Sequence, residues 1–431
     1  MVTEDKTRVA RRRVFYIPGY DPYPPRRYRE LYRTESQRQA EISGYRIDQN
    51  SDVGETGWTV HAEIDGGRTQ TKIDALVWND LVQHSMDVSI AATYGALVKT
   101  TWIYLSTGTL RRLSWLAKGP VLAALYPVVM LLGQVLLAGG LGAVLGRLVA
   151  SFVGQGAARL GGVLGVELSV EAMPLSFAGG VVFWLVFLLT TLFVLRWFKS
   201  HDHRTFAYYL MQDYAYTASE RGAYPQDIEA RLEVFRQRVT AAMQDDVDEV
   251  LIVGHSSGAQ LAVSLVADVV RSQLSRPDRP VLSLLTLGQV IPMLSFLPEA
   301  HRLRADLRFL SVCESITWLD VSAPGDGCSF ALSEPVAVSG VAPDAGQLWP
   351  LVISAAFTNT LAPETLAKLK YRYFRLHFQY LCAFDRPGDY DYFKITAGPR
   401  TLGQRFAGRQ PSKSRVDVPA SRFTSVLAAG E

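Results

Sequence analysis

Two long stretches of the sequence are almost wholly apolar and contain no charge. The first has 28 residues, Gly119 to Gly146, and the second has 24, Ala172 to Leu195. About 20 consecutive apolar residues are enough for a helix to cross a bilayer. The pattern therefore predicts a two-helix transmembrane hairpin over 113–200, with spans at about 120–146 and 173–196.

Basic residues lie outside the two stretches, which predicts the orientation of the hairpin. The flanks carry Arg111, Arg112, Lys118, Lys199 and Arg204, whereas the joining loop offsets Arg147 and Arg159 with Glu167 and Glu171. Positive flanks stay on the cytoplasmic side. We expect an integral protein of a bacterial-type inner membrane, with both termini and the polar domain cytoplasmic and the lipid bilayer as a partner. Two buried core helices or a lipase-type lid are the alternatives, and the segment 148–170 is either interfacial or re-entrant.

The polar sequence before the hairpin predicts a mixture of strands and helices. A short β-branched and aromatic run at 14–17 indicates a buried strand, and the charged stretch 25–42 has a helical pattern. Alternation punctuated by glycines predicts hairpin strands within 45–78, and a helix is expected over 87–112.

The polar sequence after the hairpin alternates helices with strands. Apolar residues at helical spacing predict a helix over 226–244, followed by a strand, a Gly-Ser turn and another helix around 250–270. Further strands are expected at 281–287, 307–321 and 371–381. Such alternation is typical of an α/β fold with a mostly parallel sheet flanked by helices.

The composition agrees with a partly membrane-embedded chain and argues against several classes of function. The chain is 48% hydrophobic, its mean hydropathy is +0.09, and its formal net charge is only +3. A strongly basic nucleic-acid binder is therefore not expected. The three cysteines have no CxxC spacing, so we predict no metal site, no disulfide framework and no cofactor, and the compartment is expected to be reducing.

The most informative segment is Gly254-His255-Ser256-Ser257-Gly258, between an apolar strand and a helix. A serine on such a strained turn projects its hydroxyl above the sheet, and the glycines at 254 and 258 let strand and helix approach each other. Ser256 is therefore the predicted nucleophile. The alternative is a glycine-rich turn with an unreactive serine.

An activated serine needs a base and an acid, which follow it in the chain when the nucleophile lies on this kind of turn. Only His301 and His377 follow Ser256. We favour His377 as the base, because His301 lies in a charged, surface-like segment. Asp326, in a Pro-Gly-rich loop, is the favoured acid, and Asp320 is the alternative.

Two backbone donors are expected to stabilise a developing oxyanion. One is the N–H of Ser257, next to the nucleophile. The other is the N–H of Tyr20, in the loop that follows the strand at 14–17, where Gly19 permits an unusual backbone angle. An ordinary strand-ending turn is an equal alternative for this loop.

These residues resemble the α/β-hydrolase superfamily, in particular its lipase-type members with a G-H-S-x-G box. The resemblance rests on GHSSGA at 254–259, IPGYDP at 17–22, the APGDG loop and LHFQYL at 376–381. It implies a hydrolase domain split into 1–112 and 201–400 around the hairpin, with a tail at 401–431. It also implies a Ser256, Asp326 and His377 triad that acts through an acyl-enzyme. The chain departs from the family in the 236 positions between Tyr20 and Ser256.

The leading hypothesis is a membrane-anchored serine hydrolase, an esterase or lipase, acting on an acyl ester or a lipid. A cap over an acyl pocket is one interpretation of the apolar residues in 329–374, and core packing is the other. A non-catalytic membrane scaffold and an acyltransferase with the same triad are the competing functions. The cluster Lys6, Arg8, Arg11, Arg12 and Arg13 indicates either a solvated tail or contact with lipid headgroups.

Overall fold

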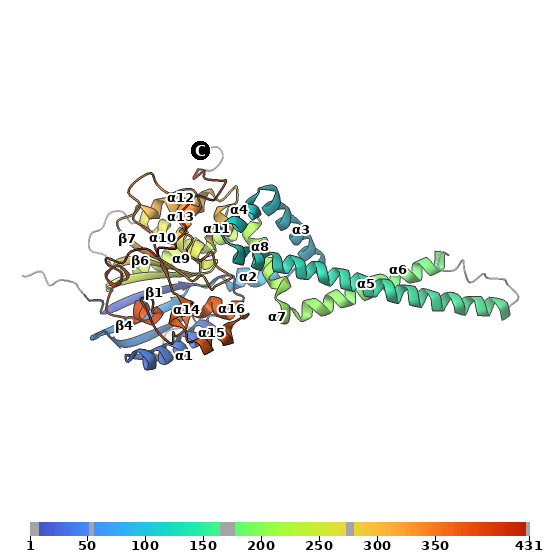
Figure 1. Ribbon diagram of the computed structural model, residues 1–431, viewed down its shortest axis with the longest axis horizontal. Helices are drawn as coiled ribbons and strands as arrows, with labels where there is room; N and C mark the ends of the chain where they lie inside the picture. Colours follow the sequence, from blue (N-terminus) through green and yellow to red (C-terminus); the bar gives the residue numbers. More distant parts are fainter. Residues whose placement is uncertain (1–7, 51–55, 164–176, 273–279, 428–431) are drawn as a thin grey trace, which may run out of the picture. The chain divides into compact units, whose positions relative to one another are not determined.

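The chain divides into two compact units. A computed structural model describes residues 8–50, 56–163, 177–272 and 280–427 (Figure 1). Unit 1 comprises Met1–Ser85, Thr101–Ala123 and Tyr216–Glu431, and unit 2 comprises Met86–Thr100 and Ala124–Ala215.

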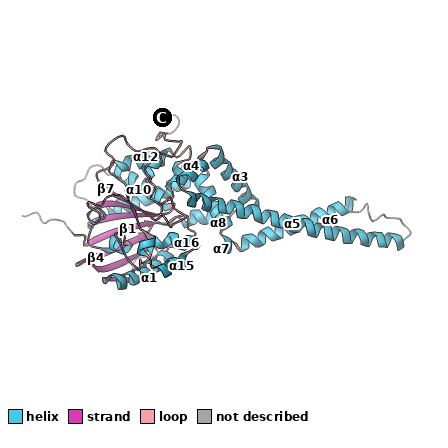
Figure 2. Cartoon of the chain, viewed as in Figure 1, coloured by secondary structure: helices cyan, strands magenta, loops and turns pink. Residues whose placement is uncertain are grey.

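Unit 1 is built on an eight-stranded, mostly parallel sheet with the strand order β2-β3-β4-β1-β5-β6-β7-β8 (Figure 2). Five of its ladders are parallel, and the two that join β2 to β3 and β3 to β4 are antiparallel. The strands are β1 Arg11–Ile17, β2 Arg46–Asn50, β3 Gly57–Ile64, β4 Gly67–Ala75, β5 Glu249–His255, β6 Val281–Leu287, β7 Ile316–Ser322 and β8 Leu351–Ser354.

The centre of the sheet joins two distant parts of the chain. β1 pairs in parallel with β5, and Arg12 lies opposite Glu249, which is 237 positions later. Both strands are predominantly apolar and buried. The residues that follow β1 and β5 therefore meet at the carboxyl edge of the sheet, where ligands bind in open α/β folds.

Helices cover both faces of the sheet (Figure 2). α10 packs on β5 and against α9 and α12, and α17 packs on β3, β4 and β1. The helices of the described residues are α1 Arg26–Ser43, α2 Asn79–Met86, α3 Ile90–Ser106, α4 Thr109–Leu116, α5 Lys118–Val163, α6 Phe177–Ser200, α7 Asp202–Thr205, α8 Ala207–Ala218, α9 Gln226–Ala242, α10 Gly258–Ser272, α11 Ile291–Ser295, α12 His301–Ser311, α13 Pro335–Val338, α14 Phe357–Thr360, α15 Pro363–Leu369, α16 Tyr373–His377, the 3₁₀ helix Phe378–Leu381, α17 Tyr392–Ala397 and α18 Leu402–Arg405.

One of the predicted strands is helical in the structure and another is helical in part. Residues 307–311, the first third of 307–321, belong to α12, where Leu303, Leu307 and Leu310 are buried at helical spacing, and Ile316–Ser322 forms the strand. The stretch 371–381 forms α16 and the 3₁₀ helix instead of a strand. Its alternation of basic and aromatic residues is not the signature of a half-buried strand, because Tyr371 to Arg375 are all exposed.

The last strand of the sheet was missed by the sequence analysis. β8 is only four residues long and pairs in parallel with β7. It lies within the apolar region 329–374, so this part of that region completes the sheet and does not form a cap. The predicted helix over 87–112 is two helices, α3 and α4, because Gly108 between them adopts a left-handed φ of 71°.

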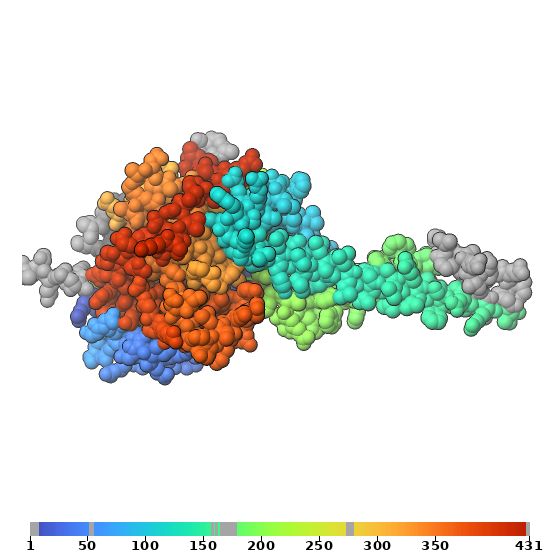
Figure 3. Space-filling model, viewed as in Figure 1, coloured from blue at the N-terminus to red at the C-terminus, as the bar shows by residue number. Residues whose placement is uncertain are grey.

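The basic N-terminal cluster is not a solvated tail in the part that the structure describes. Arg11, Arg12 and Arg13 belong to β1, and Lys6 lies outside the described residues. The buried Arg12 Nε donates to Glu249 at 2.6 Å, and its Nη1 and Nη2 donate to the carbonyls of Gly398 and Arg400. Arg12 therefore ties the C-terminal region to the centre of the sheet, and Figure 3 shows that region, in red, crossing the surface of unit 1.

Unit 2 contains most of the two long apolar helices. The parts Lys118–Gly156 of α5 and Gly179–Ser200 of α6 are long and apolar enough to span a membrane. α5 continues without a break past Arg147 to Val163, and the joining residues 164–176 lie outside the described residues. Gly142 allows close packing of the helices, since a Cβ there would lie 2.8 Å from the carbonyl oxygen of Phe187. The neighbouring Gly139 and Gly140 face open space within the described structure.

Candidate active site

Ser256 occupies a strained turn between β5 and α10. Its φ is +57°, a left-handed value that is uncommon for a residue with a side chain. Its N–H donates to the carbonyl of Leu287 at the end of β6 at 2.9 Å, and its own carbonyl accepts from Ala259 N–H. The turn thus fixes Ser256 at the carboxyl edge of the sheet, and strained backbone of this kind is concentrated at functional sites.

The two glycines of the turn are required by close packing. A Cβ at Gly254 would lie 2.6 Å from the Cβ of Ala262, so β5 could not run this close to α10. A Cβ at Gly258 would overlap the carbonyl oxygens of Ile17, the last residue of β1, and of Pro18. Both glycines therefore serve the geometry that the sequence analysis expected of them.

His377 and Asp326 form a buried pair. His377 ends α16, and Asp326 lies in the loop that follows β7. The Nδ1–H of His377 donates to Oδ2 of Asp326 at 2.7 Å. Because an ionised carboxylate only accepts, this contact fixes the proton of a neutral imidazole on Nδ1 and leaves the lone pair on Nε2.

Asp326 is held by further donors. Cys328 N–H donates to its Oδ1 at 2.9 Å, and the hydroxyl of Tyr380 donates to its Oδ2 at 3.0 Å. Burial by itself raises the pKa of the Asp326 carboxyl, but His377 and the Cys328 N–H outweigh burial and hold the pKa below its usual range. Tyr380 was not predicted as a site residue, although its position three residues after His377 was the available signal.

His255, the residue before Ser256, positions the backbone at His377. Its Nε2–H donates to the carbonyl oxygen of His377 at 3.0 Å, which leaves Nδ1 as acceptor for the Tyr16 hydroxyl at 3.4 Å. Burial, together with the nearby His377, lowers the pKa of His255 to about 3. His255 is therefore neutral at physiological pH and acts as a fixed hydrogen-bond donor.

Ser256 and the imidazole of His377 lie against the same end of β6. The Ser256 N–H is bonded to Leu287, and a Cβ on the next residue, Gly288, would lie 3.1 Å from Cε1 of His377. The Nε2 atom of His377 is buried and has no hydrogen-bond partner among the described residues. The lone pair of this nitrogen is therefore not engaged by any other described side chain or backbone group.

The loop after β1 lies directly over the Ser256 turn. A Cβ on Gly19 would lie 3.0 Å from the Cβ of Ser256. Trp78 Nε1 donates to the carbonyl of Pro18 at 3.0 Å, which fixes the start of the loop. The N–H of Tyr20, a predicted oxyanion donor, donates to the Ser257 hydroxyl at 2.9 Å. The Ser257 N–H, the other predicted donor, has no acceptor among the described residues.

The two alternative residues from the sequence analysis lie elsewhere. Asp320 is within β7 and accepts from the Thr286 hydroxyl at 2.5 Å, and burial raises the pKa of its carboxyl to about 7. His301 begins α12 and lies beside Glu299. The structure therefore brings Asp326 and His377 together at the carboxyl edge, and it brings neither Asp320 nor His301 into that pair.

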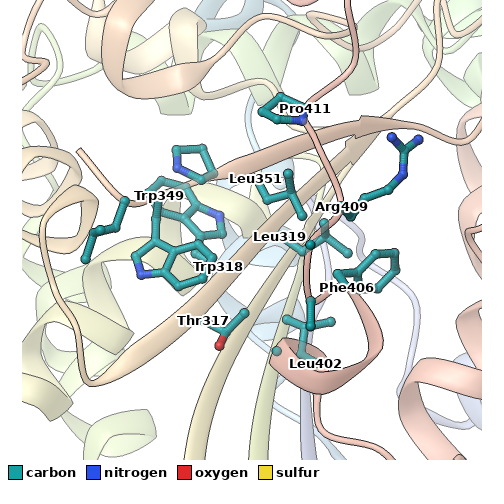
Figure 4. Close-up of a pocket in the computed structure, with 14 residues that line it drawn as sticks. Thr317, Trp318, Leu319, Trp349, Leu351, Leu402, Phe406, Arg409 and Pro411 are labelled. Atoms are coloured by element: carbon teal, nitrogen blue, oxygen red, sulfur yellow. The ribbon is translucent and has the colours of Figure 1, made fainter. Parts of the chain in front are cut away.

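A cavity of about 310 Å³ lies at the opposite edge of the sheet (Figure 4). It is lined by Thr317 and Leu319 at the start of β7, by Leu351 at the start of β8, and by Trp349 and Phe406. Since β7 and β8 are parallel, this cavity is at their amino ends, away from Ser256. It is therefore separate from the candidate active site.

The described residues contain no group of three or more His, Cys, Asp or Glu side chains that is arranged to hold a metal ion. Comparisons of the chain with protein-family models, with curated proteins and with solved structures found no match. Ser256, His377 and Asp326 are therefore the residues from which a function can be inferred.

Proposed function

We propose that the protein is a membrane-anchored serine hydrolase of the α/β-hydrolase type that cleaves carboxylic esters through an acyl-enzyme on Ser256. The observation that carries the proposal is the buried, unpartnered Nε2 of His377, which lies beside the strained Ser256 turn and is oriented by Asp326. A nucleophile, a base and an orienting acid at the carboxyl edge are the parts that this chemistry requires.

In the proposed reaction, the Ser256 Oγ bonds to the ester carbonyl carbon while its proton passes to Nε2 of His377. The carbonyl π electrons move to oxygen, and this oxyanion accepts hydrogen bonds from donors such as the Ser257 N–H. When the ester C–O bond breaks, the leaving alcohol takes the proton from Nε2. Water then attacks the acyl-enzyme in the same way, with His377 again taking the proton. Collapse of this second intermediate releases the carboxylic acid and regenerates Ser256.

The membrane part of the proposal rests on the apolar helices. Large apolar side chains such as Leu136 on α5 and Trp184 and Phe193 on α6 are exposed, which is unfavourable in water and favourable in lipid. The basic flanks favour a cytoplasmic position for unit 1 and for both ends of the chain. An anchored hydrolase meets lipid esters at a raised local concentration.

The test is labelling of the detergent-solubilised full chain with a fluorophosphonate, which reacts only with activated serines. We expect labelling of wild type, none in Ser256→Ala and strongly reduced labelling in His377→Ala. Ser272→Ala, which removes an exposed serine at the end of α10, is the matched serine control. Thermal unfolding of each variant shows whether it is folded. Folded wild type that does not label would remove the hydrolase proposal and favour a non-catalytic scaffold.

A further inference from the structure

The segment just before His377 has an unusual surface. Six consecutive residues, Lys370 to Arg375 (KYRYFR), alternate basic with aromatic side chains, and all six are exposed. Tyr371 is 75% exposed and Tyr373 is 56% exposed. We call Lys370–Arg375 the basic–aromatic segment. Neighbouring large aromatic side chains that face solvent are uncommon on proteins and typically mark an interaction surface.

The stretch of sequence between Glu364 and Asp385, which contains this segment, carries only positive charges. Between Thr365 and Phe384 the sequence contains four lysines and arginines and no aspartate or glutamate, and the cations are Lys368, Lys370, Arg372 and Arg375. All four are exposed. A surface of this charge complements anionic groups, and tyrosine and phenylalanine suit the boundary between headgroups and acyl chains.

Packing within unit 1 connects the segment with the start of a candidate membrane span. A Cβ on Gly327, next to Asp326, would lie 3.5 Å from the Tyr373 ring. A Cβ on Gly119, in the first turn of α5, would lie 3.2 Å from the Cα of the same Gly327. The candidate span begins at Lys118, and Trp115 just before it is 73% exposed. The segment, the acid loop and the interfacial end of α5 are therefore neighbours.

We propose that the basic–aromatic segment docks on the anionic headgroup layer of the bilayer that α5 and α6 cross, so that the site at His377 takes amphiphilic lipid esters from that bilayer. This inference rests on the proposed function for its chemistry and extends it to a substrate class. Arg372 and Arg375 pair with lipid phosphates, while Tyr371 and Tyr373 enter the headgroup boundary. The base adjoins the docked segment, because His377 is the last residue of α16.

The test uses the full chain in phosphatidylcholine nanodiscs with and without phosphatidylglycerol. Hydrogen exchange of peptides that cover 370–376 reports docking directly. We expect exchange about tenfold slower with phosphatidylglycerol, and loss of this difference at high salt. Equal exchange in both discs would overturn the proposal. Protection by inorganic phosphate in pure phosphatidylcholine discs would also overturn it, because it would indicate a site for free anions.

Charge variants show which residues are responsible for the effect of phosphatidylglycerol. Arg372→Gln/Arg375→Gln should lose the phosphatidylglycerol effect on exchange and on the hydrolysis of a bilayer-embedded ester. The matched control is Arg46→Gln/Arg68→Gln, which removes two exposed charges that the structure places beside Glu63. This control should keep both effects. If both double variants lose them equally, general charge and not this segment is responsible, and the proposal is wrong.

Fluorophosphonate labelling in the same discs separates this inference from the proposed function. If Ser256 is labelled but the segment does not dock, the hydrolase proposal stands and the lipid-docking proposal is wrong. If the segment docks but Ser256 is not labelled, the hydrolase proposal is wrong. The segment is then a lipid-binding surface, and the proposed substrate class is withdrawn.

Discussion

The N–H of Tyr20 donates a 2.9 Å hydrogen bond to the hydroxyl of Ser257, so the residue after the nucleophile joins the β1 loop to the β5–α10 turn. A hydroxyl that accepts from an N–H is polarised and becomes a better donor through its own hydrogen. In the proposed reaction, this hydroxyl and the Ser257 N–H would donate to the developing oxyanion, and Tyr20 would act through the hydroxyl.

Ser257→Ala should therefore slow fluorophosphonate labelling by about 10²-fold, the typical effect of losing one oxyanion donor. Ser257→Thr retains a hydroxyl and should keep most of the rate. Second-order labelling rates of the two variants and wild type measure this. A Ser257→Ala protein that labels as fast as wild type would show that the hydroxyl only occupies the Tyr20 N–H and contributes nothing to the reaction.

Asp326→Asn should reduce the labelling rate by roughly 10⁴-fold, because the amide leaves the imidazole in the wrong tautomer without removing it. Asp320→Asn is the matched control, since Asp320 bonds Thr286 and not His377. It should change the rate less than about threefold, a change of well under 1 kcal/mol in activation free energy. Equal losses in the two variants would contradict the assignment of Asp326.

The buried carboxyl of Asp320 should make unfolding dependent on pH. Burial raises the pKa of this carboxyl to about 7, well above the ordinary value of about 4 for an aspartate. The folded state therefore binds the extra proton between pH 4 and 7, so the free energy of unfolding falls as pH rises through this window and levels off above it. The effect is on the order of 4 kcal/mol.

Asp320→Asn removes this titration. Thermal unfolding in detergent should show a similar melting temperature for variant and wild type near pH 4, and a higher one for the variant near pH 8. The slope of melting temperature against pH should be correspondingly flatter for the variant. A parallel pH profile for the two proteins would show that Asp320 is not responsible.

Gly258→Ala should destabilise unit 1 and slow labelling together. Its Cβ would overlap the carbonyls of Ile17 and Pro18, so the β1 loop would move away from Ser256. Overpacking of this kind costs about 1–3 kcal/mol. Gly325→Ala, in the acid loop, has no neighbouring atom in the structure within 4 Å of its Cβ and should unfold and label like wild type. Thermal unfolding and fluorophosphonate labelling rates of both variants test this prediction. A Gly258→Ala protein that unfolds and labels like Gly325→Ala would contradict it.

Local patterns were sufficient to predict most elements near the site. The strand before Ser256, the helix after it and the amphipathic helix α9 lie close to where periodicity placed them. The pairing of His377 with Asp326, and not with Asp320, joins the end of α16 to a loop residue 51 positions earlier. Chain order and loop composition favoured that pair, but no sequence pattern shows how close the side chains of His377 and Asp326 lie in the folded chain.

The errors came from segments whose environment contradicts their local pattern. The alternating residues at 371–375 look like a strand but are exposed, and β8 is too short to have a distinct period. Arg12 carries a charge in a run of arginines, yet it is buried because Glu249 and two carbonyls surround it. Its partners lie hundreds of positions away, so only the folded chain brings them together.

The pairing of β1 with β5 imposes an order on biosynthesis. The ribosome delivers β1 to β4 first, then both apolar helices, and only afterwards β5. Until then, the edge of β1 that β5 will cover exposes unpaired backbone groups, a template for aggregation. β5, which covers this edge, leaves the ribosome only after α5 and α6. The eight-stranded sheet is therefore completed only after both apolar helices have been synthesised, and the unpaired edge of β1 persists for that interval.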